Sequence, residues 1–469
     1  MTLSPKHIHV IGICGVATSA LAIAFHKAGI KVTGSDKGFF PPVSTELEKA
    51  GIPFYAGWHP ENMTAGGAPD LIIVGTASGT MNPETAAAEQ FGIPSYSYPE
   101  IIGKYLTKKN SLVCAGTWGK TSSAALLSHI LIEAGLDPSY MFGGISLSHE
   151  SAAGLGNSGW SVVEGDEYKS SPTDSRPKFS YYKPTHLLLT AVSWDHADLY
   201  PTEESYFKAF NGLVGSLPVD GLIVANMDQL GVAKTLAGSD KKIVWYGSKD
   251  TEYSYGDVKQ SKTGLTFTIK HGDDSFKVES PMLGAFQAEN ITGCFAIAHE
   301  IGIAPEKIVA AIATFKGMKR RLEKRLDGDL AKSGVTVFDD IAHSPEKAAA
   351  VLKELRSIYK GKIIAVFEPN IGGRELEAAA KYDDAFNDAD MVTIPRLTKL
   401  KISLDKKAPM EGSELAKIIS KTHANAVYVS DDEDLLSLLL KQAKNGNIIA
   451  FLGSHGFRGM IEETVKKLS

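Results

Sequence analysis

Short apolar segments alternate with helical segments along most of the chain, and this alternation limits the choice of fold more than any other feature. We expect buried strands at His7–Ile13, Ser111–Ala115 and Lys362–Phe367, each with a helix after it. Two parallel strands need a long crossover connection, which is usually a helix packed on the face of the sheet. The sequence therefore predicts an α/β fold of mainly parallel sheets with helices on both faces.

Residues Tyr253–Glu279 break this pattern. Apolar and polar residues alternate here, and the segment contains the turn sequences Lys-Thr-Gly and His-Gly-Asp-Asp. This pattern is typical of antiparallel hairpins. We predict a small antiparallel sheet in this part of the chain.

The charge balance and the cysteines limit the partners and the compartment. The 49 Lys and Arg against 54 Asp and Glu give a net charge of -5, so no basic excess is present to drive binding to nucleic acid or to an anionic membrane. No apolar run is long enough to span a membrane, and the apolar N-terminal segment lacks the basic start of a signal peptide. Cys14, Cys114 and Cys294 are far apart and form no zinc spacing. We expect a cytoplasmic protein with reduced thiols.

The segment Cys114–Ser122 is the most informative in the chain, because it joins an expected strand to an expected helix through Gly116 and Gly119. Glycines let backbone N–H groups approach a polyphosphate, and the positive end of the helix dipole faces it. In such a loop Lys120 reaches the β- and γ-phosphates, and the Thr121 hydroxyl ligates Mg²⁺. We predict a nucleotide-binding loop, although Cys114 stands where the usual pattern has glycine. A chance Gly-Lys-Thr in a strand–helix turn is the alternative.

A second glycine turn, Gly12–Gly15, follows the first expected strand. The next strand ends at Ser35 and Asp36, where an acidic side chain can bind a ribose hydroxyl. The G-x-x-G spacing carries less information than G-x-G-x-x-G. It leaves open a nucleotide site, a dehydrogenase or a purely structural turn.

Polar side chains cluster at three further strand ends. Glu164–Glu167 closes one expected strand, Asp195–Asp198 follows another, and Asp339–Pro345 follows a third. Open α/β sheets bind ligands at the carboxyl ends of their strands. Oxygen ligands with one imidazole suit Mg²⁺ held beside phosphates, and Arg320 or Arg321 can supply charge to a phosphoryl group. Solvated turns and a helix N-cap are the alternatives.

Taken together, these segments resemble the Mur ligases, ATP-dependent ligases that add amino acids or peptides in peptidoglycan synthesis. The likeness covers essentially the whole chain in the right order. It rests on the phosphate loop Gly116–Ser122, the adenine segment Gly284–Asn290, the hinge segment Phe315–Glu323 and the third-domain segment Asp339–Pro345.

The resemblance implies a role for each matching residue. Catalysis would use Lys120, Glu164, His196 and Arg321, and the metal ligands would be Thr121, Glu164 and His196. ATP would bind to Gly116, Thr117, Trp118, Gly119, Lys120, Thr121, Ser122, Gln287, Asn290, Arg321, Asp340 and His343. The UDP-sugar would bind to Gly12, Ile13, Cys14, Gly15, Ser35 and Asp36, and the acceptor to Asn370, Arg374, Ser454 and Arg458.

Three tandem domains are expected. A UDP-sugar-binding Rossmann-like domain would occupy residues 1–108 and end near the tract Lys108–Asn110. A central P-loop ATP-binding domain, with a mainly parallel sheet and the small antiparallel sheet, would occupy residues 109–322. A Rossmann-like acceptor-binding domain would occupy residues 323–469.

Within the family, the branch that acts on UDP-N-acetylmuramate is the most similar, and Asn211 stands where other branches carry a carbamoylated lysine. This branch contains a ligase that adds L-alanine and a recycling ligase that adds L-alanyl-γ-D-glutamyl-meso-diaminopimelate. The segments similar to the recycling ligase are His7–Gly15, Pro41–Thr45, Asn82-Pro83, Glu164–Tyr168, Glu368-Pro369 and Gly456–Gly459. The resemblance thus implies peptide ligation with ATP and Mg²⁺ by a monomer or homodimer, with L-alanine ligation as the alternative.

Some residues depart from the family pattern, and two other function classes stay open. The departures are Trp118 in the phosphate loop, Phe286 and Gln287 in the adenine segment, and Ser193, Ser344 and Asn370. A Rossmann oxidoreductase would use the turn Gly12–Gly15, but it leaves the phosphate loop without a role. A non-catalytic nucleotide-binding regulator would bind ATP and release no phosphate.

Overall fold

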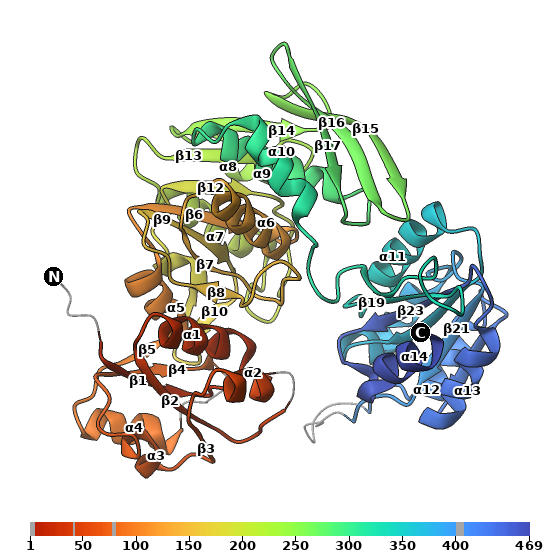
Figure 1. The fold of residues 1–469 in the computed structure, drawn as a ribbon, viewed down its shortest axis with the longest axis horizontal. Coiled ribbons are helices and arrows are strands. Elements are labelled where there is room, and N and C mark those ends of the chain that lie inside the picture. The colour runs from red at the N-terminus through yellow and green to blue at the C-terminus, as the bar shows by residue number, and fades with distance from the viewer. Residues whose placement is uncertain (1–4, 41–42, 77–80, 400–407) are drawn as a thin grey trace. The chain divides into compact units, whose positions relative to one another are not determined.

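A computed structural model of the chain describes residues 5–40, 43–76, 81–399 and 408–469, so Pro41 and Pro42 lie outside the described part. The chain forms two compact units (Figure 1). The first contains Met1–Val258, Thr266–Ser280 and Ala288–Lys316, and the second contains Lys259–Leu265, Pro281–Gln287 and Gly317–Ser469.

The first unit begins with a parallel five-stranded sheet in the order β3-β2-β1-β4-β5, drawn in red and orange in Figure 1. Its strands are β1 (His7–Ile11), β2 (Lys31–Asp36), β3 (Phe54–Ala56), β4 (Leu71–Val74) and β5 (Ser95–Ser97). Its helices are α1 (Val16–Lys27), α2 (Val43–Lys49), α3 (Pro60–Thr64), α4 (Pro83–Gln90) and α5 (Tyr98–Ile101), followed by the π-helical turn η2 (Ile102–Leu106). The strand order reverses between β1 and β4, which places a crevice at the carboxyl end of β1.

A second sheet of ten strands follows in the order β17-β16-β15-β14-β13-β12-β6-β9-β7-β8. Its strands are β6 (Asn110–Ala115), β7 (Ser139–Met141), β8 (Ala153–Gly154), β9 (Trp160–Gly165), β12 (His186–Leu189), β13 (Leu222–Asn226), β14 (Lys242–Gly247), β15 (Tyr253–Ser261), β16 (Gly264–His271) and β17 (Asp274–Ser280). The helical segments are α6 (Lys120–Glu133), η3 (Lys178–Tyr181), α7 (Glu203–Gly215), α8 (Leu230–Leu236), α9 (Gln287–Glu300) and α10 (Pro305–Thr314), and β10 (Lys169–Ser171) pairs with β11 (Asp174–Pro177) in a separate hairpin.

The central strand β6 lies between β12 and β9, and both pair with it in parallel. The carboxyl ends of the three strands therefore meet at one edge of the sheet. At the far end, two-residue connections join β15 to β16 and β16 to β17, which only antiparallel neighbours allow. The expected antiparallel part is confirmed.

The second unit contains a six-stranded sheet in the order β18-β19-β23-β20-β21-β22, with only β18 antiparallel to its neighbour. Its strands are β18 (Glu323–Leu326), β19 (Thr336–Asp340), β20 (Ile363–Glu368), β21 (Met391–Pro395), β22 (Ala426–Val429) and β23 (Ile448–Gly453). Its helical segments are α11 (Pro345–Ile358), η4 (Gly372–Arg374), η5 (Leu376–Tyr382), α12 (Gly412–Ile419), α13 (Asp432–Gln442), η6 (Phe457–Gly459) and α14 (Met460–Leu468).

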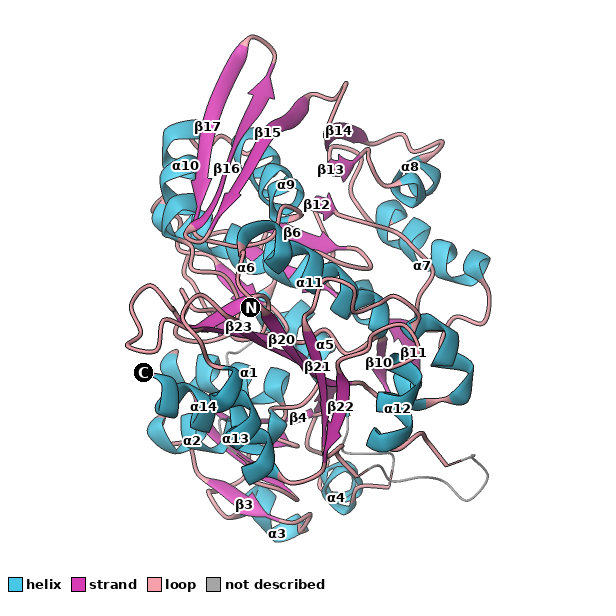
Figure 2. Ribbon diagram, turned by 90° about the vertical axis from the view of Figure 1, so that its right-hand side faces the viewer, coloured by secondary structure: helices cyan, strands magenta, loops and turns pink. Residues whose placement is uncertain are grey.

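Helices cover both faces of this third sheet. Figure 2 shows α11 and α12 on one side of β20–β22 and α13 and α14 on the other. Leu352 of α11 and Leu415 of α12 pack in one buried cluster, and Leu439 of α13 and Ile461 of α14 pack in a second. Alternate strand residues feed the two clusters, which explains why these strands read as continuous apolar runs.

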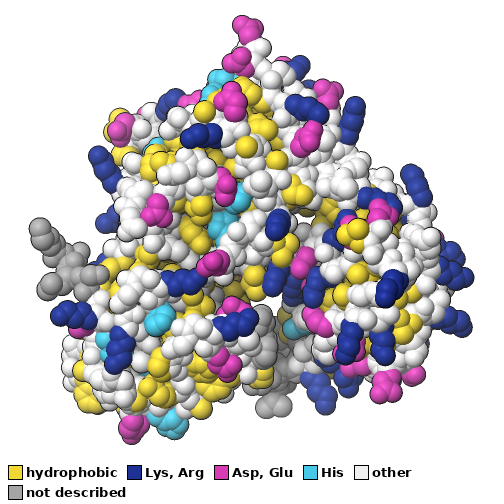
Figure 3. Space-filling model, viewed as in Figure 1, with side chains coloured by type: hydrophobic (Ala, Val, Ile, Leu, Met, Phe, Trp, Pro, Cys, Tyr) yellow, Lys and Arg dark blue, Asp and Glu magenta, His cyan; other side chains and the backbone are white. Residues whose placement is uncertain are grey.

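The predicted α/β fold with mainly parallel sheets is confirmed, and one element differs. The helix expected after the strand Lys362–Phe367 is a pair of short 3-10 segments, η4 and η5. No helix in the described part of the chain combines the length and the apolar character that crossing a bilayer requires. Acidic and basic side chains lie interspersed over the face of the first unit seen in Figure 3. The exact domain boundaries stay a prediction.

Candidate functional site

The phosphate loop joins β6 to α6, as predicted, and its backbone is held on the following strands. Thr117 donates its backbone N–H to the carbonyl of Ala191 at 2.9 Å, and its hydroxyl contacts Ser193 and Tyr206 at 2.9 Å. Gly119 has a φ of 80° and begins the helix. A Cβ at Gly119 would lie 2.5 Å from Oδ1 of Asn290. Only glycine fits this position, because both the left-handed backbone and the close approach exclude a side chain.

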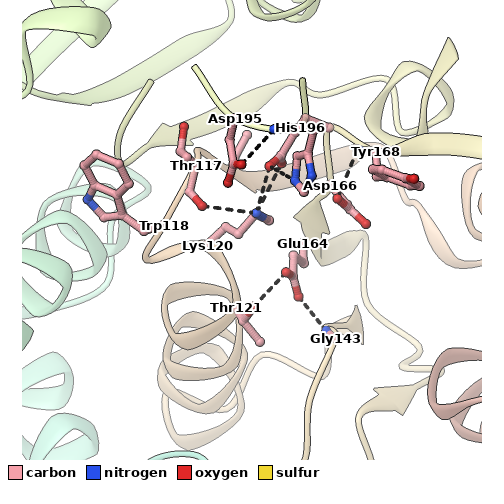
Figure 4. A network of polar contacts seen from close by, with 12 residues as sticks. Thr117, Trp118, Lys120, Thr121, Gly143, Glu164, Asp166, Tyr168, Asp195 and His196 are labelled. Carbon is pink, nitrogen blue, oxygen red and sulfur yellow. Dashed lines mark hydrogen bonds and ion pairs between the residues drawn. The ribbon is translucent and has the colours of Figure 1, made fainter. Parts of the chain in front are cut away.

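Two of the expected metal ligands touch each other beside this loop. Glu164 pairs with Cys114 in the register of β9 and β6, which places its carboxylate level with the start of the loop. Its Oε1 accepts a hydrogen bond from the Thr121 hydroxyl at 2.7 Å, and its Oε2 accepts the N–H of Gly143 (Figure 4). In the described residues no three His, Cys, Asp or Glu side chains converge as metal ligands. One hydroxyl and one carboxylate suit Mg²⁺, which takes its remaining ligands from phosphates and water.

Glu167 is a site residue that the sequence analysis did not single out. Its side chain is fully buried, and Oε1 accepts a hydrogen bond from Nζ of Lys120 at 3.2 Å. The same oxygen lies 3.4 Å from Nε2 of His196. Glu167 therefore joins the lysine of the phosphate loop to the histidine of the next strand end. The only sequence signal for Glu167 was its place three residues after Glu164. This signal did not show whether Glu167 pairs with Lys120 or lies in a solvated turn.

Burial and charge act in opposite directions on Lys120 and His196. Burial lowers the pKa of Lys120, but Glu167, Glu164 and Asp166 outweigh it and leave this pKa raised. The hydrogen bond to Glu167 raises the pKa of His196 above its ordinary value against the opposing effect of burial. One buried carboxylate thus favours the protonated form of both side chains.

The glycine turn after β1 borders a cavity of about 490 Å³. The cavity is lined by Gly12, Cys14, Gly15, Asp36, Trp58 and Tyr98, among others. Asp36 accepts the N–H of Cys14 at 2.9 Å, which holds the turn against the end of β2. Ile13 and Ser35, also predicted to bind the sugar nucleotide, are fully buried. No local motif pointed to Trp58 or Tyr98, because the fold alone brings them here.

In the second unit, two adjacent arginines have different surroundings. Arg320 donates to the carbonyls of Ser454 and His455 at 3.0 and 2.9 Å and pairs with Asp339 at 3.2 Å. Arg321 is exposed. Of the pair considered in the sequence, Arg321 is therefore the one available to a ligand.

The other expected ATP contacts of this unit lie at the end of β19. Asp340 is mostly buried, and its two oxygens accept the N–H groups of Leu322 and Ala342 at 2.7 and 2.8 Å. Burial raises its pKa, although these N–H groups oppose the shift. His343 turns Nδ1 to the carbonyl of Ile341 at 2.7 Å. Both side chains stabilise the local backbone, and their role toward ATP stays a prediction.

The four expected acceptor residues do not form one exposed cluster. Arg374 is buried and donates to the carbonyls of Met410 and Thr398, each at 3.0 Å. Asn370 accepts the N–H of Gly373, and the Ser454 carbonyl accepts from Arg320. Arg458 pairs with Asp432 at 2.6 Å and lies 4.0 Å from the buried Glu368. Arg458 is thus better placed for an acceptor than Arg374.

Comparison with known proteins identifies the family. Three family descriptions match successive parts of the chain: "Mur ligase family, catalytic domain" over residues 7–110, "Mur ligase middle domain" over 114–298 and "Mur ligase, glutamate ligase domain" over 320–455. A UDP-N-acetylmuramate–L-alanine ligase of Methylobacterium nodulans is 31% identical over 464 residues, which cover 95% of this chain and 93% of that protein. The chain belongs to the Mur ligase family.

Other relatives of this Mur ligase are named for a different acceptor. A ligase of Escherichia coli named for UDP-N-acetylmuramate and L-alanyl-γ-D-glutamyl-meso-2,6-diaminoheptandioate is 30% identical over 470 residues, which cover 98% of each chain. The crystal structure of a UDP-N-acetylmuramate–alanine ligase from Thermotoga maritima has the same fold, with a TM-score of 0.81, 23% identity and 99% of each chain covered. This Mur ligase is an ATP-dependent enzyme that forms carbon–nitrogen bonds.

The structure also shows how this Mur ligase accommodates some of its unusual residues. Ser193 holds Thr117 of the phosphate loop through its backbone N–H and carbonyl, so the identity of its side chain does not enter this contact. Ser344 caps α11 by accepting the N–H of Lys347. Trp118 and Phe286 expose about half of their surfaces, 47% and 49%.

Proposed function

We propose that this Mur ligase joins the carboxylate of UDP-N-acetylmuramate to the amine of L-alanyl-γ-D-glutamyl-meso-diaminopimelate, as in peptidoglycan recycling, with release of ADP and phosphate. The observation that carries the proposal is the contact of Thr121 with Glu164 directly beside Lys120. L-Alanine is the second candidate acceptor, because the L-alanine ligases match at a similar identity.

The chemistry proceeds by activation of a carboxylate. The muramate carboxylate attacks the γ-phosphorus of ATP, and an acyl phosphate and ADP form. The acceptor amine then attacks the acyl carbon, and phosphate leaves through a tetrahedral intermediate. The protein positions these groups and stabilises the developing negative charge. Lys120 and the N–H groups of the loop bind the transferred phosphoryl group, and Arg321 adds a second positive charge.

The oxygen atoms at the start of α6 fit a magnesium ion. Thr121 and Glu164 would hold it directly, and His196 would contact it directly or through water. When bound, Mg²⁺ neutralises charge on the β- and γ-phosphate oxygens. Glu167 holds Lys120 across the strand ends, so we expect triphosphate binding to replace a carboxylate with phosphate oxygens as the partner of this ammonium group.

The remaining substrates are assigned to the other strand ends. The cavity beside Gly12–Gly15 and Asp36 would take the uridine diphosphate group. Gln287 and Asn290 would contact adenine, Asp340 and His343 the ribose side of ATP, and Asn370, Arg374, Ser454 and Arg458 the acceptor. We further propose domain boundaries at residues 108/109 and 322/323, a monomer or homodimer as the working form, and a cytoplasmic site of action.

The decisive experiment is phosphate release with UDP-N-acetylmuramate, ATP and a panel of acceptors. The panel contains L-alanine, L-alanyl-D-glutamate, and the tripeptide with either diaminopimelate or lysine. A response to the diaminopimelate tripeptide supports the proposal, and a response to L-alanine alone assigns the biosynthetic reaction. ATP binding without phosphate release for any acceptor would favour a non-catalytic regulator.

A further inference from the structure

Trp118 is an exposed indole in a loop whose backbone is firmly held. Its side chain is 47% exposed, although tryptophan usually buries most of its large apolar surface. Its carbonyl accepts a hydrogen bond from the Thr190 hydroxyl at 2.5 Å, and the next residue, Gly119, packs against Asn290. The exposure of the indole is therefore a property of an ordered loop.

The indole lies on one particular side of the phosphate loop. Figure 4 shows it pointing away from Lys120 and Glu164. It is therefore separate from the groups that would contact the γ-phosphate and the metal.

The first turn of α9 adjoins the same part of the loop. Asn290 meets Gly119, and Asn226 donates both to the carbonyl of Thr190 and to the carboxylate of Glu289. Thr190 in turn holds the Trp118 carbonyl. A buried chain of hydrogen bonds thus fixes the position of the Trp118 backbone relative to a polar helix start.

We propose that the adenine base of ATP stacks on the indole of Trp118. This inference rests on the proposed function, in which the loop binds the triphosphate at Lys120, two residues after Trp118. A nucleotide held there by its phosphates keeps its base within reach of a side chain at the edge of the loop. Every base has a flat π-face, so an aromatic side chain binds it without reading its hydrogen-bonding groups.

The proposal also gives the departures in the adenine segment a physical meaning. Phe286 and Gln287 stand where the family pattern has His and Asn. An indole in the phosphate loop supplies base-binding surface from a different element. The chain would then bind adenine more by stacking and less by the usual polar pair.

Binding of ATP and of inorganic tripolyphosphate by the full-length protein separates stacking from phosphate recognition. We expect Trp118→Ala to weaken ATP binding roughly 5- to 150-fold and to leave tripolyphosphate binding unchanged. Trp118→Phe should retain most of the ATP affinity, because the aromatic face remains. The affinity for GTP should fall by a similar factor in Trp118→Ala, because stacking tolerates either purine.

Intrinsic fluorescence provides a second readout with a matched control. Trp194 is equally exposed, at 48%, but its Nε1 donates to the Tyr200 carbonyl at 2.9 Å. ATP should change the emission of the wild type and of Trp194→Phe, whereas tripolyphosphate should not. Trp118→Phe should lose this ATP-specific change.

Two results would overturn the inference while the proposed function stands. One is unchanged ATP affinity in a folded Trp118→Ala variant. The other is an equal loss of ATP and tripolyphosphate affinity, which would mean that Trp118 only shapes the loop. If Lys120→Ala bound both compounds as the wild type does, the proposed function itself would fail, whatever Trp118 does.

Discussion

A buried carboxylate at a strand end of the first unit binds other charged side chains, whereas two buried charged side chains of the second unit bind mainly the main chain. In the first unit, Glu167 pairs with Lys120 and His196. In the second, Arg374 and Asp340 satisfy backbone carbonyl and N–H groups. A side chain paired with another side chain can exchange that partner for a ligand. Removal of a side chain that binds the backbone leaves backbone groups unpaired and destabilises the fold.

The largest effect is expected from Lys120→Ala in the first unit. Loss of the ammonium group should lower kcat roughly 10²- to 10³-fold, because in the proposed mechanism it stabilises the charge of the transferred phosphoryl group. Phosphate release measures this effect, and circular dichroism should report an unchanged fold. Lys120→Arg is the control, since it keeps the charge but changes its geometry. Near-wild-type rates in the alanine variant would remove the catalytic assignment of the loop.

Glu167→Gln should have the next largest effect, about 10- to 100-fold on activity, because in the proposed mechanism Glu167 acts only by orienting Lys120 and His196. The hydrogen bond from Glu167 raises the pKa of His196, so the pKa of His196 should fall in the variant. NMR titration of the imidazole measures this shift. An unchanged His196 pKa would show that Glu167 is not its partner in solution.

The same variant makes a prediction about stability and pH. A histidine whose pKa is raised by folding stabilises the protein below its unfolded pKa of about 6.5, and this contribution is lost as the pH rises through the folded pKa. The free energy of unfolding should therefore differ more between wild type and Glu167→Gln at pH 6 than at pH 9. Urea unfolding at the two pH values measures the difference.

Arg374→Ala tests the second unit. It should lower the free energy of unfolding by about 1–3 kcal/mol, because two carbonyls lose a charged donor. Arg458→Ala is the matched variant: its guanidinium is partly exposed and paired with Asp432, so we expect a loss of about 0–1 kcal/mol. Thermal unfolding and the acceptor KM are measured for both. A raised KM with unchanged stability in Arg374→Ala would contradict the contrast between the units.

A small effect is expected from Ser344→Ala. Loss of an N-cap costs about 0.5–2 kcal/mol, and the distance of 3.4 Å from Ser344 Oγ to the Lys347 nitrogen favours the lower end. Asn82→Ala is the comparison in the first unit, because Asn82 caps α4 with a bond of 2.9 Å to the Glu84 nitrogen. A change in acceptor KM for Ser344→Ala would mean that this side chain faces the substrate.

Local patterns predicted most of the sheet elements correctly. The strands expected at His7–Ile13 and Ser111–Ala115 begin within one residue of β1 (His7–Ile11) and β6 (Asn110–Ala115). Apolar runs and glycine turns act over a few residues, so they can be read without knowing the fold. The prediction of a helix in the segment that forms η4 and η5 was wrong because contacts beyond a few residues determine its backbone. Its backbone is held by side-chain hydrogen bonds: one within the segment, from Tyr382 to the Gly373 carbonyl, and one to a distant residue, from Arg374 to the Met410 carbonyl.

The amino-acid sequence by itself determined the succession of strands and helices along the chain and the place of the phosphate loop. Both depend on the spacing of apolar residues and glycines within a short stretch of chain. Only the tertiary structure decided which charged groups meet. In the folded chain Glu167 is the partner of Lys120. Arg320 binds backbone carbonyls, whereas Arg321 is exposed. The indole of Trp118 points away from Glu164. Such pairings join strand ends that are far apart in sequence, and their register across the sheet places them together.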